Sequence, residues 1–254
     1  DLYGEPLRFI LSYGLTAIGA ILLGTLLKGK KPEDDRFYAK DGFILVSLAW
    51  ILLSLVGAVP FFASGEYPNF IDAFFETVSG FTTTGSTVNS AVESAKHSTL
   101  FWRSLTQFLG GMGVLVFALA IFPTGSAEGT VYLAMAEMPG PSFSKITARL
   151  SKVARILYGI YAAMTLVLFF LLWAFGMTPF DAICHAFTTA GTGGFSTKNN
   201  SIAYFDSPQI EITLGIFMLL YSVNFNLYYL LLIGEAREAS KNEELRWFAA
   251  FFGG

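Results

Sequence analysis

The chain has 254 residues, of which 54% are hydrophobic and only 14% are charged, and its formal net charge is −3. Soluble domains average about 25% charged residues, so this composition excludes an ordinary water-soluble domain. The mean hydropathy is +0.56, and the sequence has no basic tract of the kind that binds nucleic acid.

Five stretches of the chain contain no Asp, Glu, Lys or Arg and are long enough to cross a membrane. They are Phe9–Leu27, Gly42–Gly65, Ser104–Ala127, Ile156–Phe180 and Ile212–Gly234. Each stretch holds 19 to 25 residues, and about 20 helical residues cross a hydrocarbon core of about 30 Å. We therefore expect five spanning helices and an all-α integral membrane protein.

A short Thr/Gly pattern occurs twice between these stretches, at 81–87 and at 190–196. An offset of 109 positions relates the two copies and also the residues before them. It pairs Asn69 with Thr178, Asp72 with Asp181, Thr83 with Thr192, and Gly85 with Gly194. An offset that holds without a gap over such a stretch indicates an internal repeat.

We predict that each repeat consists of a spanning helix, a half-helix that re-enters the membrane, a Thr/Gly loop and a returning helix. The half-helices are predicted over about 70–81 and over Pro179–Thr189. Asn69 and Thr178 are good N-caps, and an acid three positions later meets the positive end of each helix. We interpret these acids as caps rather than ion ligands. Twelve residues give a helix of about 18 Å, which ends near the middle of the membrane.

The repeat divides the chain into five predicted segments. They are a leading transmembrane helix and cytoplasmic loop (1–40), a first helix–pore–helix repeat (41–127), a cytoplasmic connector (128–151), a second repeat (152–236) and a connector to a missing repeat (237–254). The chain begins without Met and ends as a new apolar stretch begins at Phe251. We therefore expect both ends to be cut from a longer protein.

Lysine and arginine predict the orientation in the membrane. Most of them fall in three segments, 28–40, 145–155 and 237–246, whereas the opposite side has only Arg8, Lys96, Arg103 and Lys198. Cytoplasmic loops carry an excess of positive residues, so the three segments are predicted to be cytoplasmic. The two Thr/Gly loops would then face outward.

The chemistry of the loops favours a pore lined by oxygen atoms. Backbone carbonyls that point into a cavity can replace the hydration shell of a cation. Glycine reaches the backbone angles that turn successive carbonyls the same way, and threonine adds an uncharged hydroxyl. Neither loop has a carboxylate at its centre, which suits a monovalent ion better than calcium. The plainer interpretation, in which both runs only end helices, is less favoured because the pattern occurs twice.

Several segments resemble one family of transporters. Residues 75–86 resemble the first pore loop of the Trk/Ktr/HKT superfamily of potassium transporters, and residues 191–197 are similar to its second pore loop. Residues 107–113 and 137–140 look like the bacterial TrkH-type branch. The resemblance implies a pore subunit with four repeats around one axis, of which this chain has two.

The resemblance also implies which residues contact the ion. Carried over by position, they are Thr83, Thr84, Gly85, Thr192, Gly193 and Gly194, with Thr82 and Gly191 as secondary positions. In plant relatives a serine at the first filter glycine accompanies sodium preference, so Gly85 favours potassium. Potassium would be the transported and filter-bound ion.

The implied setting is the bacterial inner membrane. Expected partners are membrane lipid, a second pore subunit in a homodimer, and a cytosolic nucleotide-binding regulatory ring similar to TrkA or KtrA. No nucleic-acid partner is expected.

The function predicted from these features is potassium uptake as the pore subunit of a Trk-type system. The alternative is a structural or regulatory membrane subunit that keeps the repeat fold without conducting. No Ser/His/Asp set, paired carboxylates within a window or metal-ligand spacing is present, so we do not expect an enzyme. A two-pore-domain potassium channel also fits the topology, but its filters usually resemble Thr-Val-Gly-Tyr-Gly.

We make a separate prediction for the contacts of each of three ionisable side chains near the loops. Glu76 and His185 occupy the same position in the two repeats, and we expect both to form hydrogen bonds behind the loops. Arg103 is expected to pair with an acid or to extend to the interface. The glycines within 110–113 should let their helix approach a neighbour closely.

Overall fold

Three long apolar helices form much of the outer surface of the molecule. The computed structural model describes residues 4–26, 39–113 and 150–253, and every regular element within these ranges is a helix. Helices α1 (Leu7–Leu26), α2 (Ala39–Ser64) and α7 (Leu150–Ala174) are each long and apolar enough to cross a membrane. They expose many large Leu, Ile, Val and Phe side chains, which suits lipid rather than water as the surrounding solvent.

The first repeat places a half-helix between two longer helices. After α2, helix α3 (Phe70–Phe81) packs against α2 and against α4 (His97–Gly111), and the short 3₁₀ helix η1 (Val92–Ser94) lies in the loop before α4. Asn69 caps α3, because its Oδ1 accepts a hydrogen bond from the backbone N–H of Ile71 at 3.0 Å. The predicted bounds and cap of this half-helix are confirmed.

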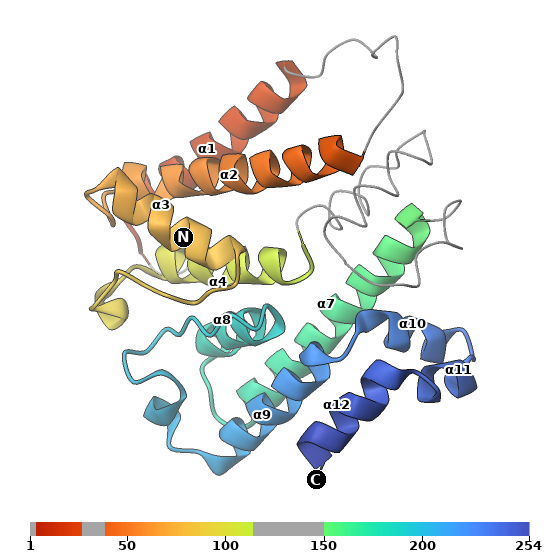
Figure 1. Cartoon of the computed structure of the whole chain (residues 1–254). Helices are drawn as coiled ribbons and strands as arrows, with labels where there is room; N and C mark the ends of the chain where they lie inside the picture. Colours follow the sequence, from red (N-terminus) through yellow and green to blue (C-terminus); the bar gives the residue numbers. More distant parts are fainter. Residues whose placement is uncertain (1–3, 27–38, 114–149, 254) are drawn as a thin grey trace.

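The second repeat has the same order. Helix α8 (Pro179–Ala190) packs against α7 and α9 (Pro208–Ser222), and the 3₁₀ helix η3 (Ser201–Phe205) precedes α9. Thr178 Oγ1 accepts a hydrogen bond from Asp181 N–H at 3.1 Å, and Pro179 opens the helix. In Figure 1 the half-helix α3 lies beside α2, and α4 passes beside the other half-helix, α8.

Three predicted spanning helices differ in the structure. The helix predicted over Ile156–Phe180 is α7, which begins at Leu150 and ends at Ala174, and Phe180 belongs to α8. The returning helix predicted over Ser104–Ala127 begins earlier, at His97, and α4 ends at Gly111, while residues 114–127 lie outside the described ranges. The helix predicted over Ile212–Gly234 is broken, since α9 and α10 (Phe225–Leu232) meet at an angle of 84°.

The break in the second returning helix has a local cause. Val223 leaves the helical conformation with ψ 139°, and Asn224 Oδ1 accepts a hydrogen bond from Asn226 N–H at 3.0 Å, which starts α10 as a new helix. Hydropathy measures composition over a window and does not register such a cap. The prediction of one continuous helix over Ile212–Gly234 was therefore wrong.

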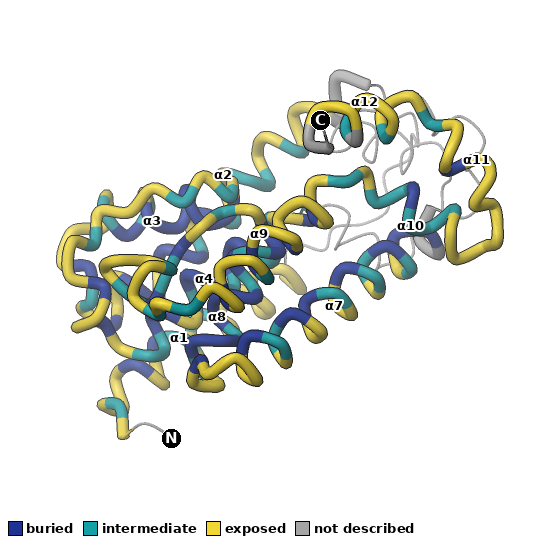
Figure 2. The backbone as a smooth tube through the Cα atoms, turned by 90° about the horizontal axis from the view of Figure 1, so that it is seen from below, coloured by how far each residue is buried: buried dark blue, intermediate teal, exposed yellow. Residues whose placement is uncertain are grey.

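The buried core lies where the half-helices meet their neighbours. Figure 2 shows buried backbone along parts of α3, α4, α7 and α8, whereas the tail helices α11 (Ala236–Ser240) and α12 (Glu243–Gly253) are mostly exposed. Helix α4 packs against both α3 and α8, so it joins the two repeats. The basic residues predicted at 28–36, together with Lys145 and Arg149, and nearly all of the connector 128–151 lie outside the described residues.

Candidate ion-filter site

The two Thr/Gly loops, the first loop (82–87) and the second loop (191–196), share one unusual backbone conformation. Thr83 and Thr192 have positive φ values of 55° and 54°, and Gly85 and Gly194 have φ values of 78° and 82°. The residue between each Thr and Gly keeps a negative φ. Alternation of this kind turns successive carbonyls toward one side of the chain, as in ion filters lined by carbonyl oxygens.

Hydrogen bonds with the same register join each loop to its half-helix. Thr83 N–H donates to Gly80 O and Thr192 N–H to Thr189 O, both at 3.0 Å, while Thr84 N–H donates to Ser79 O and Gly193 N–H to Thr188 O, both at 2.9 Å. A threonine at positive φ costs about 1–2 kcal/mol, so its occurrence at the same position in both loops indicates that the surrounding structure imposes it. The offset of 109 positions is therefore a structural repeat.

Glycine is required in the loops for two different reasons. A Cβ at Gly85 would overlap the carbonyl oxygen of Gly193, so the first loop lies directly against the second. A Cβ at Gly193 would overlap the side-chain amide of Gln107. Within the described part of the chain, a Cβ at Gly194 would meet no atom within 4 Å, but the positive φ there still favours glycine.

A hydroxyl at the end of each loop bonds to a buried polar side chain of its half-helix. In the first repeat, Thr87 Oγ1 donates to Glu76 Oε1 at 2.7 Å. At the equivalent positions of the second repeat, Ser196 Oγ and His185 Nε2 lie 2.9 Å apart. Glu76 and His185 are both buried. The expectation that these two side chains form hydrogen bonds behind the loops is confirmed.

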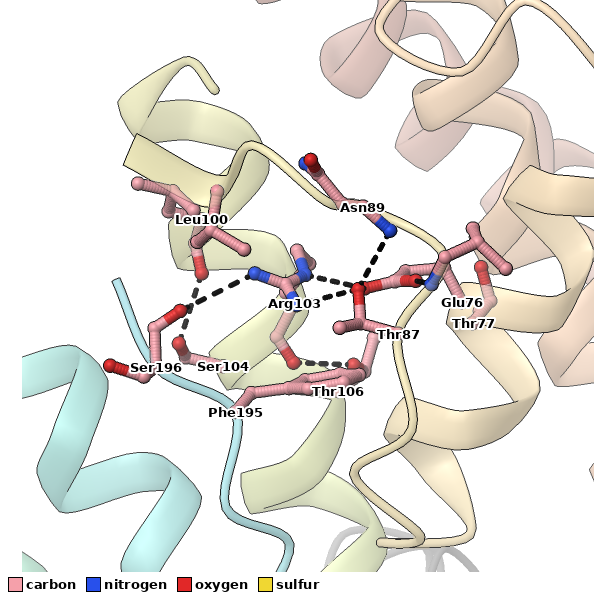
Figure 3. A network of polar contacts seen from close by, with 12 residues as sticks. Glu76, Thr77, Thr87, Asn89, Leu100, Arg103, Ser104, Thr106, Phe195 and Ser196 are labelled. Carbon is pink, nitrogen blue, oxygen red and sulfur yellow. Dashed lines mark hydrogen bonds and ion pairs between the residues drawn. The ribbon is translucent and has the colours of Figure 1, made fainter. Parts of the chain in front are cut away.

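Arg103 of α4 contacts both loops at once (Figure 3). Its Nε lies 2.6 Å from Glu76 Oε1, and its Nη2 donates to Thr87 Oγ1 at 3.2 Å. On the other side, Nη1 reaches the carbonyl oxygen of Ser196 at 3.4 Å, and the guanidinium lies 4.3 Å from the ring centre of Phe195. The side chain is 2% exposed, so it pairs with an acid and does not extend to the interface.

Gln107 is a site residue that sequence reasoning quoted only as part of a motif. It lies one turn after Arg103 on α4 and is fully buried, and its Oε1 accepts a hydrogen bond from Phe195 N–H at 3.1 Å. The available signal was an amide four positions after an arginine within an otherwise uncharged stretch. That spacing places both side chains on one face of a helix.

Comparison with known proteins identifies the family. The family model described as a cation transport protein, TrkH, matches residues 14–248. The chain belongs to the TrkH family of cation transport proteins. The TrkH-type resemblance is thereby confirmed, and membership of a transport family agrees with the expectation that the chain is not an enzyme.

The TrkH-family relatives are longer than this chain. The Trk system potassium uptake protein TrkH of Escherichia coli K12 is 41% identical over 234 residues, which is 90% of this chain and 48% of that protein. The TrkG protein of the same strain is 40% identical over 221 residues, which is 86% of this chain and 45% of that protein. The chain thus spans about half the length of the curated relatives it matches.

A solved structure supports the TrkH-family fold. The crystal structure of the potassium transporter TrkH from Vibrio parahaemolyticus is similar with a TM-score of 0.75 and 30% identity. The match covers 92% of this chain and 47% of that one. Together with the apolar helices, this similarity confirms an all-α membrane protein.

The two secondary positions of this TrkH-family chain lie where the half-helices end. Thr82 Oγ1 donates to Val78 O at 2.7 Å and lies 2.7 Å from Thr84 Oγ1, so it closes the last turn of α3. Gly191 is buried, and a Cβ there would overlap the backbone oxygen of Gln107. Both residues therefore set the entry of a loop.

Gly110 and Gly111 permit close packing of α4, as expected, whereas Gly113 lies beyond the end of the helix with a φ of 72°. A Cβ at Gly110 would overlap the carbonyl oxygen of Phe81, and one at Gly111 would lie 2.6 Å from the Cα of Gly191. Helix α4 thus lies directly against the C-terminal ends of both half-helices. The motif at 137–140 lies outside the described residues.

Proposed function

We propose that this chain is part of the pore of a Trk-type potassium uptake protein in the bacterial inner membrane, and that its two loops form two strands of a potassium filter. The observation that carries the proposal is the alternating backbone conformation at matching positions of both loops. Family membership and relatives named as potassium uptake proteins support potassium as the ion.

The proposed ion ligands are uncharged oxygens. They belong to Thr83, Thr84 and Gly85 of the first loop and to Thr192, Gly193 and Gly194 of the second, with Thr82 and Gly191 at the loop entries. The acid nearest to the first loop, Glu76, is paired with Arg103 rather than turned to an ion. Neutral oxygens hold a monovalent cation weakly enough for it to leave again.

The complete filter would need strands from outside this chain. Thr82, Thr84 and Gly194 are exposed in the chain as it stands, so one side of each loop is open. The relatives are about twice as long, which leaves room for two further repeats. We infer that those repeats close the pore.

The orientation and the partners follow from the same proposal. The basic segments 28–40, 145–155 and 237–246 would be cytoplasmic, and the loops would face outward. The complete subunit would form a homodimer and bind a cytosolic nucleotide-binding regulatory ring.

The test is growth of a potassium-uptake-deficient bacterium that carries the full-length gene. Wild type should restore growth at low potassium, whereas Gly85→Ser and Gly194→Ser should abolish the rescue or admit sodium. Gly176→Ser is the matched control, because Gly176 has a φ of 104° but lies in the turn before α8. Bacteria that carry this variant should still grow at low potassium.

Two results would contradict the proposal. Normal growth of both loop variants would mean that the loops are connectors. Failure of a well-expressed wild type to rescue growth would favour the alternative of a non-conducting structural or regulatory subunit.

A further inference from the structure

Helix α4 presents two buried polar side chains, one turn apart, to the seam between the two loops. Arg103 contacts Glu76 and Thr87 of the first repeat and Ser196 of the second. Gln107 accepts a hydrogen bond from the backbone of Phe195 in the second loop. One helix of the first repeat thus positions both loops.

The equivalent helix of the second repeat, α9, has neither of these two polar side chains. The positions 109 residues later are Ile212 and Ile216 of α9, which are 63% and 52% exposed. By contrast, the bonds of Thr87 to Glu76 and of Ser196 to His185 occur at matching positions. The bonds of Thr87 and Ser196 are therefore duplicated, whereas the contacts of Arg103 and Gln107 have no counterpart on α9. Asn199 adds two hydrogen bonds between the repeats, to Val92 N–H and Glu93 Oε1, but these lie outside the two loops.

The two charges at the seam oppose each other, and the carboxylate of Glu76 accepts three hydrogen bonds. Glu76 is 0% exposed and accepts hydrogen bonds from Arg103 Nε at 2.6 Å, Thr87 Oγ1 at 2.7 Å and Val88 N–H at 3.1 Å. A buried guanidinium without this carboxylate would repel cations in a medium where charges are weakly screened. Glu76 cancels that charge at contact distance.

We propose that Arg103 is a positioning residue for ion selectivity, which holds the first loop against the second, and that Glu76 neutralises its charge so that cations can enter. This inference rests on the proposed function, in which the loops form two filter strands. A guanidinium can bond to two loops at once because its donors diverge in one plane. The bridge then sets the spacing of the carbonyl oxygens on both strands.

The experiment compares potassium and sodium flux into vesicles that contain the full-length protein. Arg103→Gln should lower the potassium-to-sodium flux ratio by about ten-fold, the change expected when about 1.4 kcal/mol of hydrogen bonding is lost. Arg103→Lys keeps the charge but not the planar fork, so its flux should persist with a smaller loss of selectivity. Lys96→Gln, at the exposed start of the same helix, removes one positive charge outside the bridge and should match wild type.

Two further variants separate charge from position. Glu76→Gln should reduce the flux of both cations, because it leaves the guanidinium unpaired. The double variant Glu76→Gln/Arg103→Gln is neutral at the seam again, so its flux should recover while its selectivity stays low. A double variant that conducts as poorly as Glu76→Gln would overturn the role given to charge.

Backbone amide exchange tests the bridge without transport. In the full-length protein, Arg103→Gln should accelerate exchange over both 82–88 and 192–198 by about ten-fold relative to Lys96→Gln. Unchanged exchange together with unchanged selectivity would refute the bridge. If wild type carries no potassium, the proposed function fails and the selectivity role fails with it, while exchange still decides whether Arg103 holds the loops together.

Discussion

At the scale of single residues, backbone freedom and close contact determine the loops. Gly85 must be glycine for both reasons, because its φ is positive and a Cβ would overlap the backbone of Gly193. Thr83 and Thr192 adopt the left-handed conformation despite their Cβ atoms. The loops are therefore positioned by the packing around them and not by glycine alone.

The consequence for stability can be measured with two alanine variants. Gly85→Ala should lower the free energy of unfolding by about 1–3 kcal/mol or more, since the backbone it meets cannot rotate away. Gly159→Ala, on the exposed side of α7, should raise it by about 0.5–1 kcal/mol through helix propensity. Thermal unfolding in detergent gives both values. A Gly85→Ala variant that is as stable as Gly159→Ala would show that the contact between the loops is not tight.

At the scale of elements, each half-helix is defined at both ends by local chemistry. A capped N-terminus fixes where it starts, and the loop takes over its last carbonyls. In the second repeat the cap extends further, because Asp181 accepts hydrogen bonds from both Thr178 and Thr197. The start of α8 is thereby joined to the segment that follows the second loop.

Loss of each cap should lower the free energy of unfolding by a different amount. Asn69→Ala removes one hydrogen bond and should lower it by about 1 kcal/mol. Thr178→Ala removes the cap and also one partner of Asp181, so it should lower the free energy of unfolding further and accelerate amide exchange near Thr197. Thr178→Ser keeps the hydroxyl and should restore both the stability and the exchange rate. Equal losses of stability in the two alanine variants would argue against the extended cap.

At the scale of the whole molecule, α4 joins the repeats and an apolar exterior surrounds them. The helix packs against α3 and α8, and most of its residues are buried or half-buried. The loops touch each other but keep an open side. Two repeats thus make about half of the pore proposed here.

The open side leads to a prediction about the chain by itself. Vesicles that contain only these 254 residues should carry no selective potassium current, because two strands cannot surround an ion. Co-expression with the remainder of the full-length protein should restore uptake if the halves assemble. Selective potassium flux through the 254-residue chain alone would show that two copies can complete a filter.

The amino-acid sequence by itself determined the repeat, the half-helices and the residues of both loops. Caps such as Asn69 and Thr178, and the fixed offset between Gly85 and Gly194, are local signals that can be read without knowing the fold. The predicted bounds of a spanning helix were wrong where a local cap interrupted an apolar stretch, as at Asn224, because hydropathy averages over the break.

Tertiary structure alone decided how the loops meet. The bridge from Arg103 to Ser196 joins residues 93 positions apart, and Gln107 reaches Phe195 over 88 positions. A helical pattern shows which side chains share a face but not which neighbour that face meets. Only the packing of α4 between the two half-helices turned two separate loops into one site, because a side chain acquires its partners from the elements placed around it.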